Sequence, residues 1–241
     1  MKQFLRNCVV LVSFILLAAS VLVFSFRFKI DPINSMFRAN FSRERTTQEF
    51  FRLFDEGDAR FQLAKSVDRI LLIEQKPILS QVTKAELPTL FQPYTRSGNK
   101  ATVTSEATPV STEDKNMFSE KELTDLMKTI LTQHKGFDVY IFVVGKMEES
   151  PTYTGITYGE RSFVIFVDRI RELSEVQDVR EKIERTTFLH EFGHLLGFAH
   201  VTDENCLMSE IIHSPGKNWA MFQVPTTYCN EQLETLYDLQ Q

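Results

Sequence analysis

The apolar residues of this chain fall into segments with different spacing, and the first segment is the longest. Residues 7–26 carry no charged side chain, and sixteen of these twenty residues are apolar. Twenty helical residues span about 30 Å, which is the thickness of the hydrocarbon core of a bilayer. The pattern therefore predicts an N-terminal membrane helix within residues 1–30. A long signal peptide, cleaved near the small residues 18–20, is the alternative.

After this segment the pattern indicates a linker followed by one folded domain. Residues 31–65 mix charged and aromatic positions at irregular spacing, which indicates a juxtamembrane stalk or a propeptide. Residues 66–241 contain enough apolar side chains for one domain with its own core. Strand-like and helical periods both occur in this domain, so the predicted fold class is α+β.

The strands predicted in this domain are short apolar runs with polar residues at their ends. They cover residues 69–75, 137–144 and 162–167, and residues 152–158 form either a further short strand or one arm of an ordinary hairpin. A helix is predicted after Ser119, because Ser119 and Glu122 form a capping-box pattern before an apolar stripe. Residues 95–116 are rich in Ser, Thr and charged side chains and predict a long surface loop. A second helix is predicted over residues 176–196.

The charged residues indicate which partners are not expected and how the membrane segment is oriented. The chain has a net charge of −5 at pH 7 and no block of basic residues, so nucleic acid is not expected as a partner. Lys2 and Arg6 favour an N-terminus that stays inside, although Arg27 and Lys29 weaken this asymmetry. The folded domain is therefore expected to be exported.

The second predicted helix contains the pattern H-E-x-x-H-x-x-G-x-x-H, formed by residues 190–200. His190 and His194 are four residues apart, so they lie one turn apart on one helix face, with Cβ atoms about 5–6 Å from each other. Two imidazole nitrogens at this spacing bind one Zn²⁺ at about 2.0–2.1 Å. Glu191 is rotated away by about 100° and flanks the metal, where it can take a proton from a zinc-bound water.

His200 reaches the same ion only if the chain leaves the helix first. Ten residues of continuous helix would place it about 15 Å further along the axis. Gly197 is suited to ending the helix, because glycine accepts the left-handed conformation. Three protein ligands leave one tetrahedral position for water, which is typical of a catalytic zinc site. The alternatives are a helix without metal and a site that binds zinc without catalysis.

These residues resemble the signature of the metzincin metallopeptidases, in which the same extended motif is followed by a methionine turn. The resemblance gives Met208 the role of the apolar floor below the three histidines. It also implies a mixed sheet, an active-site helix and a small C-terminal subdomain. In this family an edge strand before the helix binds the substrate backbone by strand addition, and we place that strand at residues 152–158.

Within the metzincins, the residues after His200 look most like an archaemetzincin, with a matrixin-like peptidase as the competing subgroup. Four cysteines of archaemetzincins hold a second, structural zinc in this region. Here the four positions are Val201, Cys206, Thr226 and Cys229, so only two of them are cysteines. The resemblance therefore implies one catalytic Zn²⁺ and no second, structural zinc.

Cys206 and Cys229 have two states open to them. In an exported domain they meet an oxidising compartment and are able to form a disulfide. Otherwise they are two buried free thiols. Of the remaining histidines, His134 suits the end of a helix, where an imidazole meets the negative end of the dipole. A lone His such as His213 is more often structural, with a place in the substrate pocket as the alternative.

The predicted activity is the hydrolysis of internal peptide bonds by a zinc-dependent endopeptidase, with Glu191 as general base and a peptide or protein as substrate. One alternative is an aminopeptidase, and another is a membrane-anchored protein that binds zinc without turnover. The expected location is the membrane, with the catalytic domain exported. Secretion after cleavage of a signal peptide is the second possibility for the location.

Overall fold

A computed structural model describes residues 59–75, 79–107, 117–209 and 224–241 of the chain, all within one unit that spans residues 56–241. The predicted membrane helix within residues 1–30, the stalk up to residue 58 and His213 lie outside the described residues. Within the described ranges, no helix is both long and apolar enough to cross a membrane. The membrane helix therefore stays a prediction.

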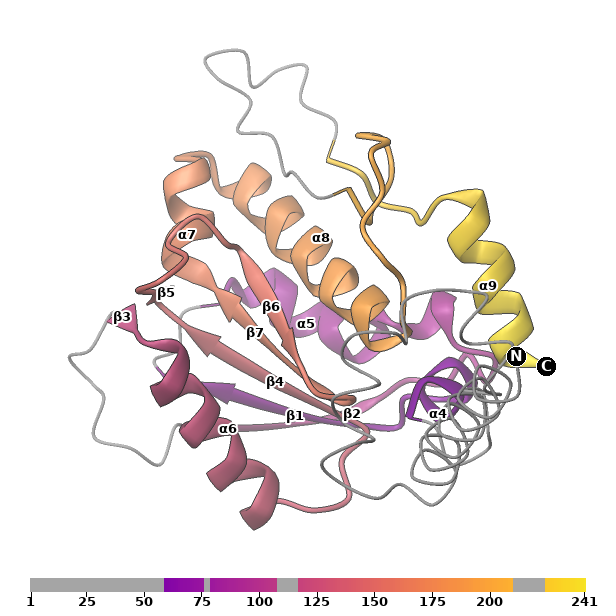
Figure 1. Cartoon of the computed structure of the whole chain (residues 1–241), viewed down its shortest axis with the longest axis horizontal. Coiled ribbons are helices and arrows are strands. Elements are labelled where there is room, and N and C mark those ends of the chain that lie inside the picture. The colour runs from indigo at the N-terminus through magenta and orange to yellow at the C-terminus, as the bar shows by residue number, and fades with distance from the viewer. Residues whose placement is uncertain (1–58, 76–78, 108–116, 210–223) are drawn as a thin grey trace, which may run out of the picture. The chain divides into compact units, whose positions relative to one another are not determined.

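The centre of the unit is a five-stranded sheet with the order β2-β1-β4-β7-β6 (Figure 1). The strands are β1 (Arg69–Glu74), β2 (Thr102–Ala107), β4 (Val139–Val144), β6 (Gly155–Tyr158) and β7 (Ser162–Phe166). The first four in this order run parallel to one another, whereas β6 is antiparallel to β7 at one edge. A small second sheet pairs β3 (Met117–Phe118) with β5 (Lys146–Met147). The predicted mixed sheet is thus confirmed.

The helices lie on both faces of the large sheet (Figure 1). They are α4 (Ala59–Lys65), α5 (Gln81–Leu90), α6 (Glu120–Gln133), α7 (Val167–Leu173), α8 (Gln177–Leu195) and α9 (Asn230–Gln240), with a 3₁₀ turn η1 (Gln92–Tyr94). Helix α6 covers one face, and α5 and α8 cover the other. Strands β1, β4 and β7 are therefore buried almost throughout, which explains their continuous apolar sequences.

Helix α6 begins where the sequence predicted it. The Ser119 side chain accepts a hydrogen bond from the backbone N–H of Glu122, and the Glu122 carboxylate accepts one from the backbone N–H of Ser119. This capping box satisfies two backbone donors at the helix start. The apolar stripe that follows is buried against the sheet by the side chains of Leu123, Leu126, Met127 and Ile130.

Strand β2 corrects the prediction of a long loop over residues 95–116. Residues 102–107 form a strand that pairs in parallel with the whole of β1. The sequence of β2 is polar because the strand lies at the outer edge of the sheet, where four of its six side chains are exposed. Such a strand lacks the apolar run or alternation by which strands are recognised from sequence.

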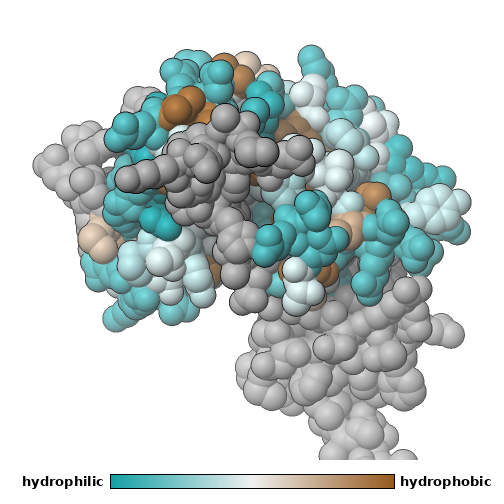
Figure 2. Space-filling view, turned by 90° about the horizontal axis from the view of Figure 1, so that it is seen from above, coloured by the Kyte–Doolittle hydropathy of each residue, from teal (hydrophilic) through white to brown (hydrophobic). Residues whose placement is uncertain are grey.

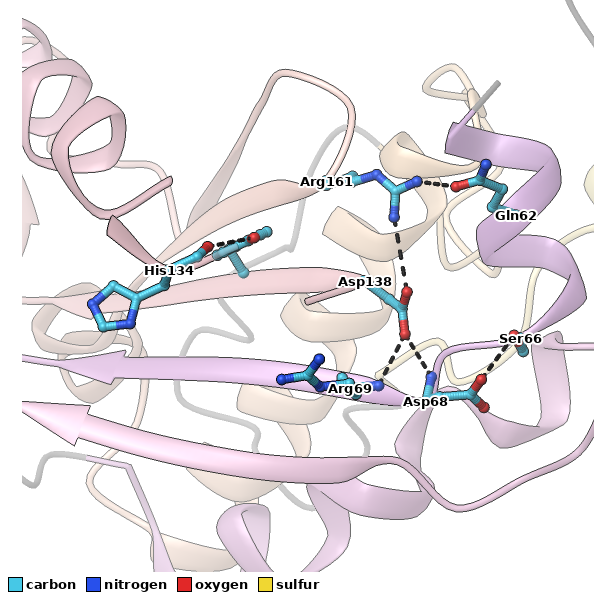
Figure 3. Close-up of polar contacts among 8 residues, drawn as sticks. Gln62, Ser66, Asp68, Arg69, His134, Asp138 and Arg161 are labelled. Carbon is cyan, nitrogen blue, oxygen red and sulfur yellow. Dashed lines mark hydrogen bonds and ion pairs between the residues drawn. The ribbon is translucent and has the colours of Figure 1, made fainter. Parts of the chain in front are cut away.

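The folded unit begins before residue 66, because α4 packs into it. Leu63 and Ala64 are fully buried, so residues 59–65 belong to the domain and not to the predicted stalk. Polar contacts fasten the same helix at the end of the sheet where the parallel strands begin (Figure 3). Arg161 bonds to Gln62 of α4 and pairs with Asp138, 3.9 Å away. Asp138 in turn accepts two hydrogen bonds of 2.9 Å from the backbone at the start of β1.

The surface of the unit is largely hydrophilic on the face shown in Figure 2. Large apolar side chains that are exposed among the described residues come mainly from separate elements. They are Val82, Met117, Tyr153, Val176, Leu233 and Tyr237. Leu233 and Tyr237 are an exception, because they lie four residues apart on α9 and share one helix face.

Candidate metal centre

Helix α8 ends in a turn that changes the chain direction between the second and third histidine. Gly197 has a φ of 88°, which is the left-handed region where an L side chain is strained. The Gly197 N–H bonds to the His194 carbonyl at 3.0 Å, and the Phe198 N–H bonds to the Gly193 carbonyl at 2.9 Å. This pair of bonds is the Schellman pattern that closes a helix C-terminus. The turn sends the chain back along the helix and brings His200 to the other two histidines.

The three histidines converge on one point through their Nε2 atoms. The Nε2 atom of His200 lies 3.1 Å from that of His190 and 3.0 Å from that of His194. Three nitrogens that bind one tetrahedral zinc at about 2.0–2.1 Å stand about 3.3 Å apart, so the observed spacing is close to what the ion requires. Among the described residues, this is the one group of His, Cys, Asp or Glu that has the geometry to hold a metal.

Backbone carbonyls set the tautomer of two of these imidazoles. The Nδ1 atom of His190 lies 2.8 Å from the Leu207 carbonyl, and that of His194 lies 2.9 Å from the Phe198 carbonyl. A carbonyl only accepts, so each Nδ1 carries the proton and donates it. Both Nε2 atoms therefore present a lone pair to the shared point. This arrangement orients metal-ligating histidines and raises their basicity as ligands.

Burial also favours the neutral imidazole at His190. It lowers the pKa of this side chain to about 4, with a smaller lowering from His200 and an opposing effect of the hydrogen bond to Leu207. A metal ligand must be deprotonated, and His190 meets this condition at neutral pH without further change. His200, by contrast, is exposed to solvent.

Glu191 lies on the buried side of the helix, against the sheet. Its side chain is 4% exposed, and burial raises the pKa of its carboxyl to about 8, while a hydrogen bond from Thr157 acts in the opposite direction. The Thr157 hydroxyl donates to Glu191 Oε2 at 2.8 Å. A divalent cation beside Glu191 would lower this pKa, because an opposite charge favours the ionised form.

Met208 lies beneath α8 and is fully buried. A Cβ atom built on Gly193 would lie 2.5 Å from Met208 Sδ and 2.9 Å from Tyr228 Cε1, so both side chains contact the helix backbone directly. The Tyr228 hydroxyl donates to the Leu189 carbonyl at 2.6 Å. Met208 and Tyr228 therefore form a closely packed floor beneath the helix at Gly193, and a side chain at this position would clash with them.

Cys206 and Cys229 are joined by a disulfide in the structure, with Cα atoms 5.3 Å apart. This Cα separation lies within the range that disulfides span without backbone movement. The bond ties the segment after the third histidine to the start of α9. Next to Cys206 in the sequence, the Leu207 N–H also bonds to the Thr227 carbonyl at 2.9 Å. Leu207, whose carbonyl orients His190, is therefore held in place by the neighbouring disulfide and by its own hydrogen bond to Thr227.

Four residues of this site were not singled out by the sequence. They are Gly155, Thr157, Gly193 and Tyr228. Gly193 lies inside the motif, where a glycine in a helix signals a close approach of another group. The other three contact α8 from segments 30 or more residues away, so no local pattern identifies them. His134 caps the end of α6 and pairs with Glu106 at 3.5 Å, and it is not part of the group of three histidines.

The fold is similar to that of an archaemetzincin from Methanopyrus kandleri, with a TM-score of 0.55 and 17% sequence identity. The similarity covers 72% of this chain and 95% of that one. The chain has the archaemetzincin fold. A zinc-dependent peptidase from Methanocorpusculum labreanum has a TM-score of 0.49 and 14% identity, over 70% of this chain and 99% of that one. No family model matches the sequence, and no curated protein is similar to it in sequence.

The archaemetzincin fold agrees with the likeness expected from the motif, and the histidine group fits the zinc ion that the motif implies. In this fold the site lies between the C-terminal half of α8 and the segment that follows it. The antiparallel strand β6 lies beside the same half of the helix, as the hydrogen bond between Thr157 and Glu191 records. The site is thus built from three parts of one unit, which are helix α8, the segment that follows it and strand β6.

Proposed function

We propose that this chain is a zinc-dependent peptidase that cleaves internal peptide bonds. The observation that carries the proposal is the convergence of three histidine Nε2 atoms beside a buried carboxyl, Glu191. The likeness of the fold to that of an archaemetzincin supports it. His190, His194 and His200 would hold the zinc ion.

The chain's own contribution to the reaction comes from Glu191. Zinc bound by the three histidines supplies a Lewis acid and lowers the pKa of water at the site to around 7. Glu191 then serves as general base for the attacking water and returns the proton to the departing amine. Burial against β6 and the hydrogen bond from Thr157 hold the carboxyl in place for both steps.

Strand β6 supports cleavage within a peptide chain and not only at its end. No described strand pairs with its outer edge. The Phe166 N–H bonds to the Thr154 carbonyl, so the backbone groups of every second residue after Thr154 face β7. The backbone groups of Gly155 and Thr157 accordingly face outward. An extended peptide can add to this edge as a further strand, which leaves both of its ends free.

The test uses the full-length chain and a library of internally quenched peptides with blocked ends. We expect one zinc per chain and cleavage that stops on chelation and returns when zinc is restored. Cleavage of free-ended peptides alone would assign an aminopeptidase and contradict the endopeptidase proposal. One zinc without cleavage of any peptide would favour a zinc-binding protein without turnover.

We further propose that the peptidase domain is exported and anchored by the predicted helix within residues 7–26. The support for export is the bond between Cys206 and Cys229, because disulfides persist in oxidising compartments and are rare in the cytosol. The apolar length of residues 7–26 supports the anchor. Secretion after signal cleavage is the competing outcome, and the N-terminal sequence of the mature chain separates the two.

A further inference from the structure

The four residues of β6 divide their side chains between two helices. Ile156 and Tyr158 pack against the apolar cluster that contains the buried face of α6. Gly155 and Thr157 alternate with them and face α8, where both approach Glu191. Successive side chains of a strand point to opposite faces, so this division follows directly from the pairing register with β7. The strand therefore presents two positions to the proposed general base.

The hydroxyl of Thr157 is directed at the carboxyl of Glu191. Its Oγ1 atom lies 2.8 Å from Oε2 and 3.2 Å from the backbone carbonyl of the same residue. A hydroxyl has one proton to donate, and the shorter contact to the carboxyl oxygen is the stronger of the two. Within the part of the chain that the structure describes, Thr157 is the only side chain that donates a hydrogen bond to this carboxyl.

The neighbouring Gly155 shapes the other side of the carboxyl. A Cβ atom at this position would lie 2.7 Å from Glu191 Oε1 and 2.8 Å from its Cγ. Any side chain would therefore displace Glu191. Thr157 thus bonds to one carboxyl oxygen, and the space around the other depends on the absence of a side chain at Gly155.

We infer that Thr157 is a positioning residue that fixes the rotation of the Glu191 carboxyl. The last torsion of a glutamate side chain is broad, so the plane of the carboxyl group can rotate. The hydrogen bond from Thr157 to Oε2 restricts this rotation and fixes the direction in which the lone pairs of the carboxyl group point. The inference rests on the proposed peptidase function, and Thr157 acts through Glu191 without contact with the substrate by its side chain.

This role differs from that of the Thr157 backbone, which faces the open edge of the sheet. Substrate pairing would use the backbone and would change KM, whereas orientation of Glu191 would change kcat. Thr157→Val keeps the backbone and the shape of the side chain but removes the donor. Thr157→Ser keeps the donor. Thr104→Val, on the exposed part of β2 at the other edge of the sheet, is the matched control.

The kinetic experiment compares these variants of the full-length, zinc-loaded chain on a blocked, internally quenched peptide. We expect Thr157→Val to lower kcat about tenfold with KM and zinc content unchanged, which is the effect of losing one hydrogen bond to a charged group. Thr157→Ser should regain most of the loss. An unchanged kcat, an equal loss in Thr157→Ser, or a loss confined to KM would overturn the inference.

A second measurement does not depend on turnover. The infrared difference between the wild-type chain and Glu191→Gln identifies the carboxyl bands of Glu191. These bands should shift in Thr157→Val and stay in place in Thr157→Ser and Thr104→Val. Bands that do not shift in Thr157→Val would contradict the hydrogen bond itself. Absence of cleavage by the wild-type chain, with shifted bands, would contradict the peptidase function and leave the contact established.

Discussion

Helix α8 is supported from two sides, and the two supports differ in kind. On the sheet side, β6 places a hydroxyl and a bare glycine against Glu191. On the opposite side, the segment after the helix places the Leu207 and Phe198 carbonyls against two ligands and Met208 and Tyr228 under the backbone. The first support touches the group that moves protons, and the second touches the groups that hold the metal.

This difference predicts that the two sides of α8 can be perturbed separately. Changes on the sheet side should reduce turnover while zinc stays bound. Changes on the side of the following segment should weaken zinc binding and lower the stability of the fold, because there the ligands and the floor share one set of contacts.

The largest effect is expected from Glu191→Gln, which keeps the shape of the side chain and removes its basicity. Zinc content should remain at one per chain, because Glu191 is not among the converging ligands. The rate of cleavage should fall by about 10²- to 10⁴-fold, the usual contribution of a general base. Single-turnover kinetics on the quenched peptide, with metal analysis of the same sample, measure both quantities.

Glu181→Gln is the matched control, since Glu181 lies on the same helix and, among the described residues, bonds only to Gln177 through an exposed contact. Its activity should equal that of the wild-type chain. Loss of zinc in Glu191→Gln would show that the carboxyl helps to hold the ion, and the proposed division of labour between the two sides would then be wrong.

The next effect concerns the disulfide on the other side of the helix. Cys206→Ser with Cys229→Ser opens a loop whose ends are 23 residues apart. The chain-entropy model gives a loss of stability of about 3 kcal/mol for a loop of this length. Zinc affinity should fall as well, because Leu207 follows Cys206 directly and its carbonyl orients His190. Denaturant unfolding and zinc titration measure the two changes.

Thiol counting tests the bond itself. The chain has three cysteines, Cys8, Cys206 and Cys229, so the unreduced, denatured protein should expose one thiol if the bond is present. Three reactive thiols in protein taken from its native compartment would contradict both the disulfide and the proposed export.

The smallest effect is expected from Gly193→Ala, which places a methyl group against the floor of the helix. Alanine is favoured over glycine in a helix by about 1 kcal/mol, whereas overpacking a filled core costs about 1–3 kcal/mol. The rigid Tyr228 ring, 2.9 Å from the new atom, makes the second effect larger, so we expect a net loss of about 1 kcal/mol. Denaturant unfolding measures it.

The double variant Gly193→Ala, Met208→Ala separates the two contributions, because it removes the sulfur atom that the methyl group meets at 2.5 Å. The two substitutions should be less than additive in their cost. A Gly193→Ala variant more stable than the wild-type chain would mean that Met208 and Tyr228 yield without cost, and that the floor is not closely packed.

Local patterns predicted the elements whose determinants lie close together in the sequence. The capping box at Ser119, the apolar runs of β1, β4 and β7 and the ends of α8 are of this kind. Strand β2 was missed because its polar side chains reflect its position at the sheet edge, and that position depends on pairing with β1. Helix α4 was assigned to a stalk for a similar reason, since its burial comes from elements far along the chain.

The sequence by itself determined the ligand set and the turn that assembles it. Helical spacing puts His190 and His194 on one face, and the positive φ of Gly197 brings His200 back within a few residues. Only the tertiary structure decided which groups surround these side chains. Thr157 reaches Glu191 across 34 positions, and Tyr228 reaches Leu189 across 39, because strand pairing and burial bring them together and no short-range pattern encodes such contacts.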